Sequence, residues 1–497
     1  MYLNNRPLVL VIAGLDSGGG AGITADMLTI HDCGAWGLPC VSAITAQSLK
    51  NVTRIEESSI EQFRETLKLA REDWDHISAA KIGLITNKDI LEATLNFFEN
   101  TSHKIPLVWD PVLTATAGRL ESADLKSTLN RILKVSTIFT PNLPEALELA
   151  GWTPEDLEKY GTQKLGEYFI DNGAENVIIK GGHKTGTDTA IDTFVSKELS
   201  FTMSNPKVEG DGAHGGGCAF SSALATLIAD GYAAHDAAVI AKAYVYSGIL
   251  NPALPYNKER PPVGHNGVPD NISLFPFIQE NEFPNQTNSF TNCKKKLGLY
   301  PVVDSYEWVE RVLKAGVKTL QLRIKAKSSP DLFDQIDKSV KLAKQYDAEL
   351  FIDDHYELAI KAGAYGVHLG MEDLKKADLQ KISRAGLRLG ISTHGPYEML
   401  KAYQLKPSYI ALGHIFPTNT KIMNSKPQGI EKLKYQNQLL AHENICTVAI
   451  GGIKLHNAKD VLKTGVRSIA LISGITKADD PEKTILEWQK LFESQQE

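Results

Sequence analysis

The stretch ELFIDDHYELAIKAGAYGVHLGMEDL (349–374) contains one complete strand–helix–strand unit. The nearly continuous apolar runs ELFID and YGVHL predict two strands, and HYELAIKAGA between them has the length and spacing of a helix. Strands that are apolar on both faces are typical of parallel sheets, because helices cover both sides of such a sheet. This unit therefore predicts a parallel α/β architecture for the second half of the chain.

The same unit recurs on both sides of this stretch. Eight runs suited to strands are separated by gaps long enough for helices: LYPVVD (299–304), TLQLRI (319–324), ELFIDD (349–354), YGVHLG (365–370), RLGIST (388–393), YIALGHI (409–415), TVAIGG (447–452) and SIALIS (468–473). Eight parallel units in about 200 residues predict a (β/α)8 TIM barrel. We expect it to span residues 297–497.

The first half of the chain, residues 1–254, also alternates strands with helices, but less evenly. The candidate strands are LVLVIAG (8–14), CVSAITAQ (40–47), AAKIGLI (79–85), PLVWDP (106–111), STIFTP (136–141), NVIIKGG (176–182) and DTAIDTFV (188–195). They predict a doubly wound, mostly parallel sheet with ligands beyond the carboxyl ends of its strands. The segment 255–296 is rich in Pro, Asn and Gly and is predicted to be a linker between two domains.

Composition narrows the class of function. The 497 residues are 42% hydrophobic and 23% charged, which suits two folded domains. The formal charge of −6 lacks the basic excess of proteins that bind nucleic acid or anionic membranes, and no apolar run is long enough to span a bilayer. The five cysteines form no CxxC pair, which argues against a disulfide framework. We expect a soluble, cytoplasmic protein that acts on small molecules, with its oligomeric state left open.

Polar residues gather at the carboxyl ends of the predicted barrel strands, where barrel enzymes place their active sites. Three cations, Arg323, Lys325 and Lys421, would converge on an anion of several charges, such as a diphosphate. Asp354 and Asp373 follow adjacent strands and could share one Mg²⁺, an ion that usually takes one or two carboxylates and completes its shell with substrate phosphates. This rim predicts a metal-assisted diphosphate site.

A second anion site is predicted on the same rim. Gly452 and Ser473 follow the seventh and eighth strands, where barrels often bind phosphate through backbone N–H groups. The two sites together suit a pair of substrates, one carrying a diphosphate and the other a monophosphate.

Seven motifs occur in order along this half: QLRIK (321–325), FIDD (351–354), GVHLGMEDL (366–374), GISTH (390–394), GHIFPTNTK (413–421), AIGGI (449–453) and LISGI (471–475). Over residues 297–490 the chain resembles the thiamine phosphate synthase family. The resemblance implies coupling of 4-amino-2-methyl-5-(diphosphooxymethyl)pyrimidine to a thiazole phosphate, with release of diphosphate.

The resemblance also implies residue roles, with Arg323 and Lys421 as catalytic residues. The pyrimidine diphosphate would be held by Gln321, Arg323, Lys325, Asp353, Ser392 and Lys421, and Mg²⁺ by Asp354 and Asp373. The thiazole phosphate would be held by Thr418, Thr420, Gly452, Ile472 and Ser473. The chain departs from the family at three positions, where Glu, Asn and Gln are common and this sequence has Ile324, Asp353 and Met371.

Two glycine-rich segments stand out in the first half. GLDSGGGAGITAD (14–26) links a strand to a helix but matches neither a P-loop nor a dinucleotide-binding motif. GDGAHGGGCAFSSALATLIADG (210–231) leads directly into a helix, so the free N–H groups of residues 215–218 would face one anion. Such a pocket suits the charge on a transferring phosphoryl group.

Two shorter motifs add polar groups. NLPE (142–145) places Asn142 and Glu145 on one helical face, where they suit Mg²⁺, and KGGH places Lys180 at a strand end. Together with GGAGITAD, ITAQ, KIGL and HGGGCAFSSA, these motifs resemble the ribokinase-like family over about residues 6–252, specifically the hydroxymethylpyrimidine/phosphomethylpyrimidine kinases.

This second resemblance implies a kinase that uses ATP and Mg²⁺, with Lys180 and Cys218 as catalytic residues. The pyrimidine would be bound by Gly14, Asp26, Gln47, Leu84 and Val112, and the ATP phosphates by Glu145, Lys180, Gly215, Gly216, Gly217 and Cys218. Gly216 stands where the family usually has Thr. We expect the helix N-terminus to lower the pKa of Cys218, although this residue also suits a purely structural helix start.

The two resemblances imply consecutive steps of thiamine biosynthesis. A pyrimidine alcohol would be phosphorylated to its mono- and diphosphate in the first domain and coupled in the second. Three alternatives remain open: a pyridoxal-type kinase, a thiazole tautomerase-like barrel, and a non-catalytic thiamine-phosphate-binding barrel. The PTNTK motif and the Asp354/Asp373 pair favour the synthase.

Overall fold

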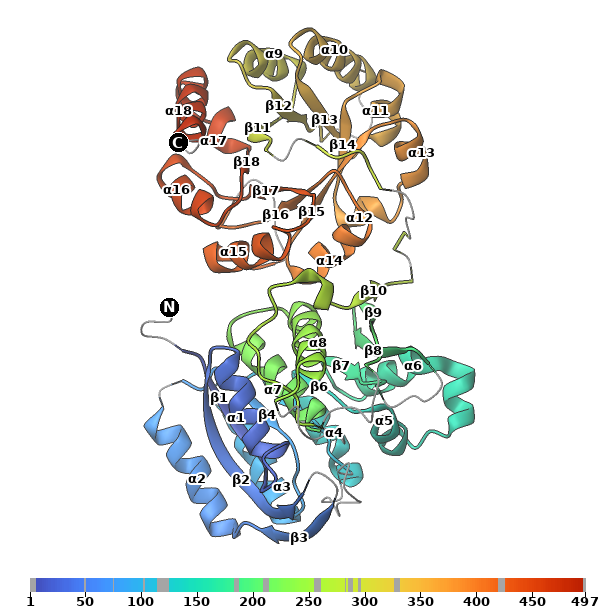
Figure 1. Ribbon diagram of the computed structural model, residues 1–497, viewed down its shortest axis with the longest axis vertical. Coiled ribbons are helices and arrows are strands. Elements are labelled where there is room, and N and C mark those ends of the chain that lie inside the picture. Colours follow the sequence, from blue (N-terminus) through green and yellow to red (C-terminus); the bar gives the residue numbers. More distant parts are fainter. Residues whose placement is uncertain are drawn as a thin grey trace. The chain divides into compact units, whose positions relative to one another are not determined.

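The computed structural model (Figure 1) describes residues 6–48, 51–74, 76–101, 103–113, 125–182, 187–208, 214–253, 261–281, 283–284, 289–293, 296–325, 331–418 and 425–494. The chain forms two compact units. One consists of Met1–Pro269 and Ser273–Asn281, and the other of Asp270–Ile272 and Glu282–Glu497. Among the described residues, no helix is both long and apolar enough to span a membrane.

The first unit is built on one mixed sheet with the strand order β10-β9-β8-β7-β6-β5-β4-β1-β2-β3. Its described strands are β1 (Leu8–Asp16), β2 (Trp36–Gln47), β3 (Val52–Glu57), β4 (Ala79–Ile82), β5 (Leu107–Trp109), β6 (Ile138–Phe139), β7 (Asn176–Ile179), β8 (Thr189–Ser196), β9 (Ser200–Pro206) and β10 (Phe277–Gln279). The central strands from β7 to β2 are parallel, and β3, β8, β9 and β10 are antiparallel additions at the edges. The predicted α/β sheet is confirmed, and the sequence did not predict β3, β9 or β10.

Helices cover both faces of this sheet (Figure 1). One face carries α1 (Gly22–Asp32), α7 (Gly216–Ala229) and α8 (Ala234–Leu250), and the other carries α2 (Ile60–Asp73), α3 (Lys88–Glu99), α4 (Leu125–Val135), α5 (Leu143–Ala150) and α6 (Pro154–Asp171). Helix α4 shows why they dock: its buried residues Leu125, Leu129, Ile132 and Leu133 recur at helical spacing and form one apolar face. The helices pack on a core that includes Trp109, Phe139 and Phe169.

Part of the predicted linker, 255–296, is folded onto the first unit. Val263, Phe275 and Ile278 are buried, and β10 pairs with β9 in antiparallel register. These apolar residues lie between prolines and asparagines without regular spacing, so periodicity did not reveal them. A short 3₁₀ helix, η1 (Ile272–Leu274), precedes β10.

The second unit is a closed barrel, and all eight of its predicted strands are present. They are β11 (Gly298–Val303), β12 (Thr319–Leu322), β13 (Glu349–Asp353), β14 (Gly366–Leu369), β15 (Arg388–Thr393), β16 (Tyr409–Leu412), β17 (Cys446–Ile450) and β18 (Ser468–Leu471). Every neighbouring pair is parallel, including β11 with β18. The predicted TIM barrel is confirmed.

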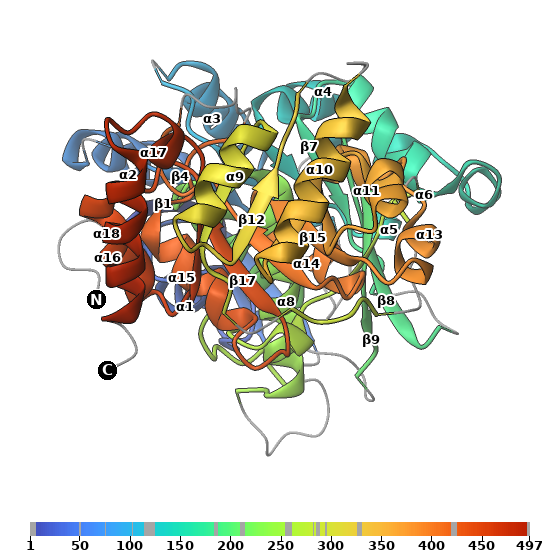
Figure 2. The same cartoon turned by 90° about the horizontal axis from the view of Figure 1, so that it is seen from above.

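Helices surround the barrel, as Figure 2 shows for α9, α10, α16 and α18 around β12 and β17. The described helices are α9 (Tyr306–Lys314), α10 (Leu332–Gln345), α11 (Tyr356–Ala362), α12 (Met371–Leu374), α13 (Leu379–Arg384), α14 (Pro396–Gln404), α15 (Gly429–Leu439), α16 (Leu455–Lys463), α17 (Ser473–Thr476) and α18 (Pro481–Glu493). The interior is filled by side chains that include Tyr300, Phe351 and Tyr409. The barrel is therefore a packed core, and its chemistry lies at the strand ends.

Candidate functional site

The two glycine-rich segments of the first unit meet in space. Asp16, the last residue of β1, accepts a hydrogen bond from the Gly18 amide at 2.7 Å, and its Oδ2 lies 3.1 Å from His214 Nε2. Gly215 has a φ of +80°, and a Cβ on it would lie 1.9 Å from the carbonyl oxygen of Gly20. Only glycine allows the two backbones to approach this closely, so glycines of both segments are needed where the segments pack together.

A charged cluster lies at the carboxyl ends of the parallel strands, where ligands were predicted. Lys180 follows β7, and its Nζ lies 2.6 Å from Oδ1 of Asp110, which follows β5. Ser221 of α7 donates to the other oxygen of Asp110 at 3.2 Å. A Cβ on Gly217 would lie 3.4 Å from Lys180 Nζ and 3.7 Å from Asp110 Oδ2, so the first turn of α7 faces this ion pair. The arrangement brings a cation and free backbone N–H groups together.

Glu145 adds a second carboxylate to this cluster. It forms a capping box with Asn142 at the start of α5, in which each side chain accepts a hydrogen bond from the other residue's backbone N–H, at 2.8 and 2.9 Å. Burial raises the pKa of Glu145 to about 7, although Lys180 lowers it, and the neighbouring Asp110 raises it further. No cluster of three or more His, Cys, Asp or Glu side chains suited to a metal occurs among the described residues. Two carboxylates beside a phosphate site nevertheless suit Mg²⁺.

The expected lowering of the Cys218 pKa is wrong. Burial raises the pKa of this thiol to about 11, because the favourable effect of Lys81 does not outweigh desolvation and the nearby carboxylates Asp26 and Asp110. The thiol therefore stays protonated at neutral pH, which does not fit a general base.

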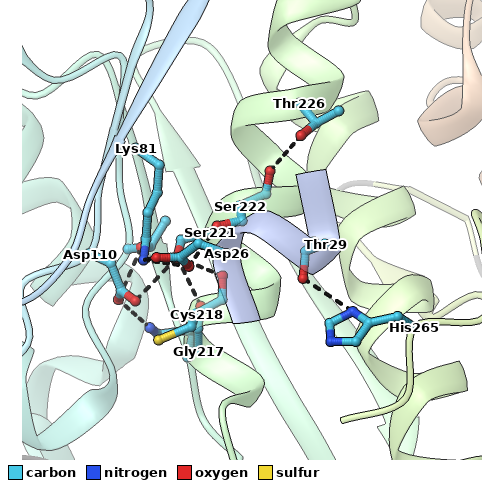
Figure 3. Close-up of polar contacts among 12 residues, drawn as sticks. Asp26, Thr29, Lys81, Asp110, Gly217, Cys218, Ser221, Ser222, Thr226 and His265 are labelled. Atoms are coloured by element: carbon cyan, nitrogen blue, oxygen red, sulfur yellow. Dashed lines mark hydrogen bonds and ion pairs between the residues drawn. The ribbon is translucent and has the colours of Figure 1, made fainter. Parts of the chain in front are cut away.

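Asp26, predicted to bind the pyrimidine, lies in a buried ion pair. Both of its carboxylate oxygens lie 2.7 Å from Lys81 Nζ, and Ser222 donates to Oδ1 at 2.8 Å (Figure 3). Both charged side chains are 0% exposed. Burial raises the pKa of Asp26, and Lys81 opposes this rise. The pair joins α1 to β4, and Ser222 adds a contact from α7.

We expect Lys81→Met to destabilise the first unit by about 3–5 kcal/mol, because it leaves the Asp26 carboxylate buried without a cation. Urea unfolding followed by hydrogen exchange at β1 and β4 would measure this loss separately from unfolding of the barrel. The double variant Lys81→Met/Asp26→Asn should recover most of the stability, because no buried charge remains. A single variant as stable as the wild type would contradict the role of the pair.

The other predicted pyrimidine residues lie along the ends of β1, β2, β4 and β5. A Cβ on Gly14 would lie 3.1 Å from a methyl group of Leu84, so these two residues are adjacent. Gln47 ends β2, and its backbone N–H donates to Ser17 Oγ at 2.9 Å, beside the first glycine-rich segment. Val112 is half-buried and follows Asp110 by two residues.

In the barrel, three predicted residues lie together. Asp353 at the end of β13 accepts a hydrogen bond from Gln321 Nε2 at 2.5 Å, and its other oxygen lies 2.8 Å from Arg323 Nε. Burial and the adjacent Asp354 raise the pKa of Asp353 to about 7, while Arg323 lowers it. With 7% exposure, Asp353 holds the Arg323 and Gln321 side chains in place at the rim.

The two predicted metal ligands are neighbours. Asp354 is exposed at the rim, and Asp373 lies in α12. Partial desolvation of its carboxyl by the surrounding rim raises the pKa of Asp354, and the charge of Asp373 and a side-chain hydrogen bond to it raise the pKa further. Two carboxylates held side by side repel each other unless a proton or a cation lies between them, and this donor set fits Mg²⁺.

The described members of the predicted thiazole phosphate set lie on the loops after β16, β17 and β18. Gly452 has a φ of +65°, and a Cβ on it would lie 2.6 Å from the carbonyl oxygen of Pro417, so the β16 and β17 loops pack tightly. Thr418 continues the β16 loop, and Ile472 and Ser473 stand at the start of α17. Lys325 is exposed on the β12 loop, and Thr420 and Lys421 lie outside the described residues.

Comparisons with known proteins match each unit separately. The family described as "Phosphomethylpyrimidine kinase" matches residues 16–264, and that described as "Thiamine monophosphate synthase" matches residues 299–475. A thiamine-phosphate synthase of Proteus mirabilis is 55% identical over 206 residues, which cover 41% of this chain and 95% of that protein. The chain belongs to both families.

Two solved structures resemble the kinase domain. A phosphomethylpyrimidine kinase from Clostridium difficile shares 30% identity and covers 48% of this chain and 97% of its own, with a TM-score of 0.42. A pyridoxal kinase from Staphylococcus aureus in complex with AMP-PCP and pyridoxal shares 26% identity with this chain. The match covers 56% of this chain and 98% of that kinase, with a TM-score of 0.49.

The chain is thus a bifunctional enzyme of thiamine biosynthesis. Its kinase domain has a ribokinase-like fold, phosphorylates the phosphomethylpyrimidine and uses ATP, and its barrel is the thiamine-phosphate synthase. These predictions from sequence are confirmed.

Sequence reasoning missed several polar residues of the kinase domain: Asp16, Lys81, Asp110, His214, Ser221 and Ser222. Two of them carried a signal. Lys81 interrupts the apolar run AAKIGLI, and a charged residue inside a buried strand needs a partner. Asp110 ends the strand PLVWDP, at the edge where ligands were expected. The others could be found only once α7 was placed against β1 and β5.

Proposed function

We propose that the kinase domain adds two phosphoryl groups in succession, at one site, to 4-amino-5-hydroxymethyl-2-methylpyrimidine. The observation that supports a phosphoryl-transfer site is the Lys180–Asp110 pair, at 2.6 Å, facing the first turn of α7. In this proposal Lys180 and the N–H groups of residues 215–218 bind the transferring phosphate. Gly216 keeps the backbone donors that the usual Thr would also supply.

In the same proposal, Asp110 and Glu145 hold Mg²⁺. When bound, this ion would neutralise charge on the ATP phosphates. The protonated thiol of Cys218 is compatible with both steps, because transfer passes through a loose transition state that needs little proton removal from the alcohol. The second acceptor is a phosphate oxygen, which is already ionised. We therefore assign Cys218 a place in the pocket wall and no role as a base.

We propose that the synthase domain works mainly by stabilising the leaving diphosphate. Arg323, Lys325 and Lys421 would surround this anion, with Arg323 held in place by Asp353. Asp354 and Asp373 would hold Mg²⁺, which supplies further charge neutralisation when bound. The pyrimidine's 4-amino group can push electrons towards the methylene carbon, so the diphosphate would leave before the thiazole nitrogen attacks. No side chain of the described rim is needed as a base in this route.

We also propose that each activity belongs to one domain. The kinase would lie in residues 1–254, the synthase in 297–497, and the linker within 255–296. Because β10 belongs to the first sheet, only the residues after 281 would act as the linker between the two domains.

The proposal is tested by an end-point assay on the pure full-length chain. With the pyrimidine alcohol, thiazole phosphate and MgATP, thiamine phosphate should accumulate without any other enzyme. Product from the pyrimidine monophosphate but not from the alcohol would contradict the first phosphorylation. A parallel assay should give a higher kcat/KM for the pyrimidine alcohol than for pyridoxal, and the reverse order would favour a pyridoxal-type kinase.

A further inference from the structure

Four side chains from four different strands form a chain of hydrogen bonds inside the barrel. The hydroxyl oxygens of Tyr300 (β11) and Tyr409 (β16) are 2.8 Å apart. The Tyr409 hydroxyl lies 2.7 Å from Nδ1 of His368 (β14), and Nε2 of His368 lies 2.7 Å from Oγ of Ser392 (β15). The tyrosines are at most 1% exposed, whereas Ser392 is half-buried at the carboxyl end of its strand. The chain thus runs from the core to the active-site rim.

The surrounding residues are shaped to hold this chain. The His368 ring stacks on the Tyr409 ring, with centroids 5.6 Å apart and planes 19° apart, and Phe351 meets Tyr409 edge-on at 5.2 Å. A Cβ on Gly390 would lie 2.4 Å from the Tyr409 hydroxyl oxygen, so only glycine leaves room for this hydroxyl. Gly390 belongs to the GISTH motif, whose Ser392 ends the hydrogen-bond chain.

The direction of the hydrogen bonds follows from the buried end. Among the described residues, the Tyr300 hydroxyl has one hydrogen-bond partner, Tyr409. Burial raises the pKa of both tyrosines, so both keep their protons. A buried hydroxyl that does not donate carries a desolvation penalty, so Tyr300 donates to Tyr409 and Tyr409 donates to His368 Nδ1.

The direction of the remaining hydrogen bonds, at His368 and Ser392, is then determined. Because Nδ1 of His368 accepts a hydrogen bond, the neutral ring carries its proton on Nε2 and donates it to Ser392 Oγ. Ser392 therefore accepts from the core and must direct its own proton elsewhere. With the opposite polarity, the Tyr300 proton would have no acceptor among the residues that the structure describes. With a doubly protonated His368, one of the two tyrosine hydroxyl protons would have no acceptor among those residues.

We propose that Tyr300, Tyr409 and His368 are positioning residues that orient Ser392 as a hydrogen-bond donor to a phosphate oxygen of the pyrimidine diphosphate. This inference rests on the proposed contact between Ser392 and that substrate. A donor oriented before the substrate arrives needs no rearrangement on binding, which strengthens its contact with the anion.

The test is a double-mutant cycle on the full-length enzyme, measured as kcat and KM for the pyrimidine diphosphate. Tyr409→Phe removes one oxygen and lets the His368 ring take its other tautomer, so that Ser392 donates to the ring. We expect Tyr409→Phe and Ser392→Ala each to lower kcat/KM about tenfold, the scale of one lost hydrogen bond. The double variant should be no worse than Ser392→Ala. Phe351→Leu is the matched control, because it disturbs the same rings without touching the chain, and its effect should add to that of Ser392→Ala.

A second readout follows the tautomer directly. In the full-length chain labelled with ¹⁵N-histidine, the His368 signal (assigned by its loss in His368→Gln) should show the Nε2–H form, and Tyr409→Phe should convert it to a mixture. An Nδ1–H form in the wild type would overturn the proposal. The proposal would also be overturned if Ser392→Ala lowered kcat/KM and the loss from Tyr409→Phe then added in full to it in the double variant. Normal coupling by Ser392→Ala would instead overturn the proposed contact of Ser392 with the substrate, and the inference with it.

Discussion

Asp354→Asn and Asp373→Asn should each lower coupling by roughly a hundredfold or more, with both phosphorylations unchanged. The two carboxylates are neighbours at the barrel rim, where the charge of Asp373 raises the pKa of Asp354. In the proposed mechanism a shared Mg²⁺ would relieve this repulsion and offset charge on the departing diphosphate, so losing either ligand would remove stabilisation that grows as the bond breaks. Coupling rates from pyrimidine diphosphate and thiazole phosphate would measure the loss. Titration with Mn²⁺, followed by its electron paramagnetic resonance, would measure binding without turnover.

Asp353→Asn is the matched control for this prediction. Asp353 is the immediate neighbour of Asp354, yet it is buried against Gln321 and Arg323. Asparagine, common at this position in the family, keeps an oxygen for Arg323 and removes a negative charge near the diphosphate. Coupling should therefore stay within a few-fold of the wild type, and Mn²⁺ binding should persist. Near-normal coupling by both the Asp354 and the Asp373 variants would contradict the metal assignment.

Gly217→Val should lower both phosphorylations together by roughly a hundredfold, the scale on which removing one oxyanion-type donor acts. A Cβ at this position already lies 3.4 Å from Lys180 Nζ and 3.7 Å from Asp110 Oδ2. The two methyl groups of valine would occupy the space between the helix start and the ion pair, where we propose that the phosphoryl group lies. Separate assays with the pyrimidine alcohol and with its monophosphate would measure the two steps, while coupling by the barrel should be unchanged.

Gly216→Thr is the control for this helix start. Among the described residues, a Cβ on Gly216 would meet only Val245, at an ordinary 3.9 Å, and the family usually has Thr here. This variant should keep both kinase activities. Comparing it with Gly217→Val would show whether a side chain harms the kinase anywhere in this turn or only where it faces Lys180. If Gly217→Val slowed only one of the two phosphorylations, the proposal of a single site for both would be wrong.

The sequence alone determined the barrel and most of its rim. Each barrel strand is a short, nearly continuous apolar run, and such runs can be buried only in a parallel sheet with helices around it. Because the functional groups of a barrel follow its strands directly, locating the strands also located Arg323, Asp354 and Asp373. The central strands of the kinase sheet were predictable for the same reason. Strand β3, with its mostly polar sequence VTRIEE, and β10, within the Pro- and Asn-rich segment, carried no such signal.

Only the tertiary structure decided how charges are paired and how far they are buried. Asp26 looked like a pocket residue until α1, β4 and α7 enclosed it with Lys81, which is 55 residues away in sequence. Cys218 stands at a helix start, which by itself lowers a thiol pKa, but burial near Asp26 and Asp110 raises it to about 11. The hydrogen bonds from Tyr300 to Ser392 likewise depend on side chains from four strands meeting inside the barrel. Desolvation and hydrogen-bond polarity depend on every element packed around a group, and no local stretch of sequence contains that information.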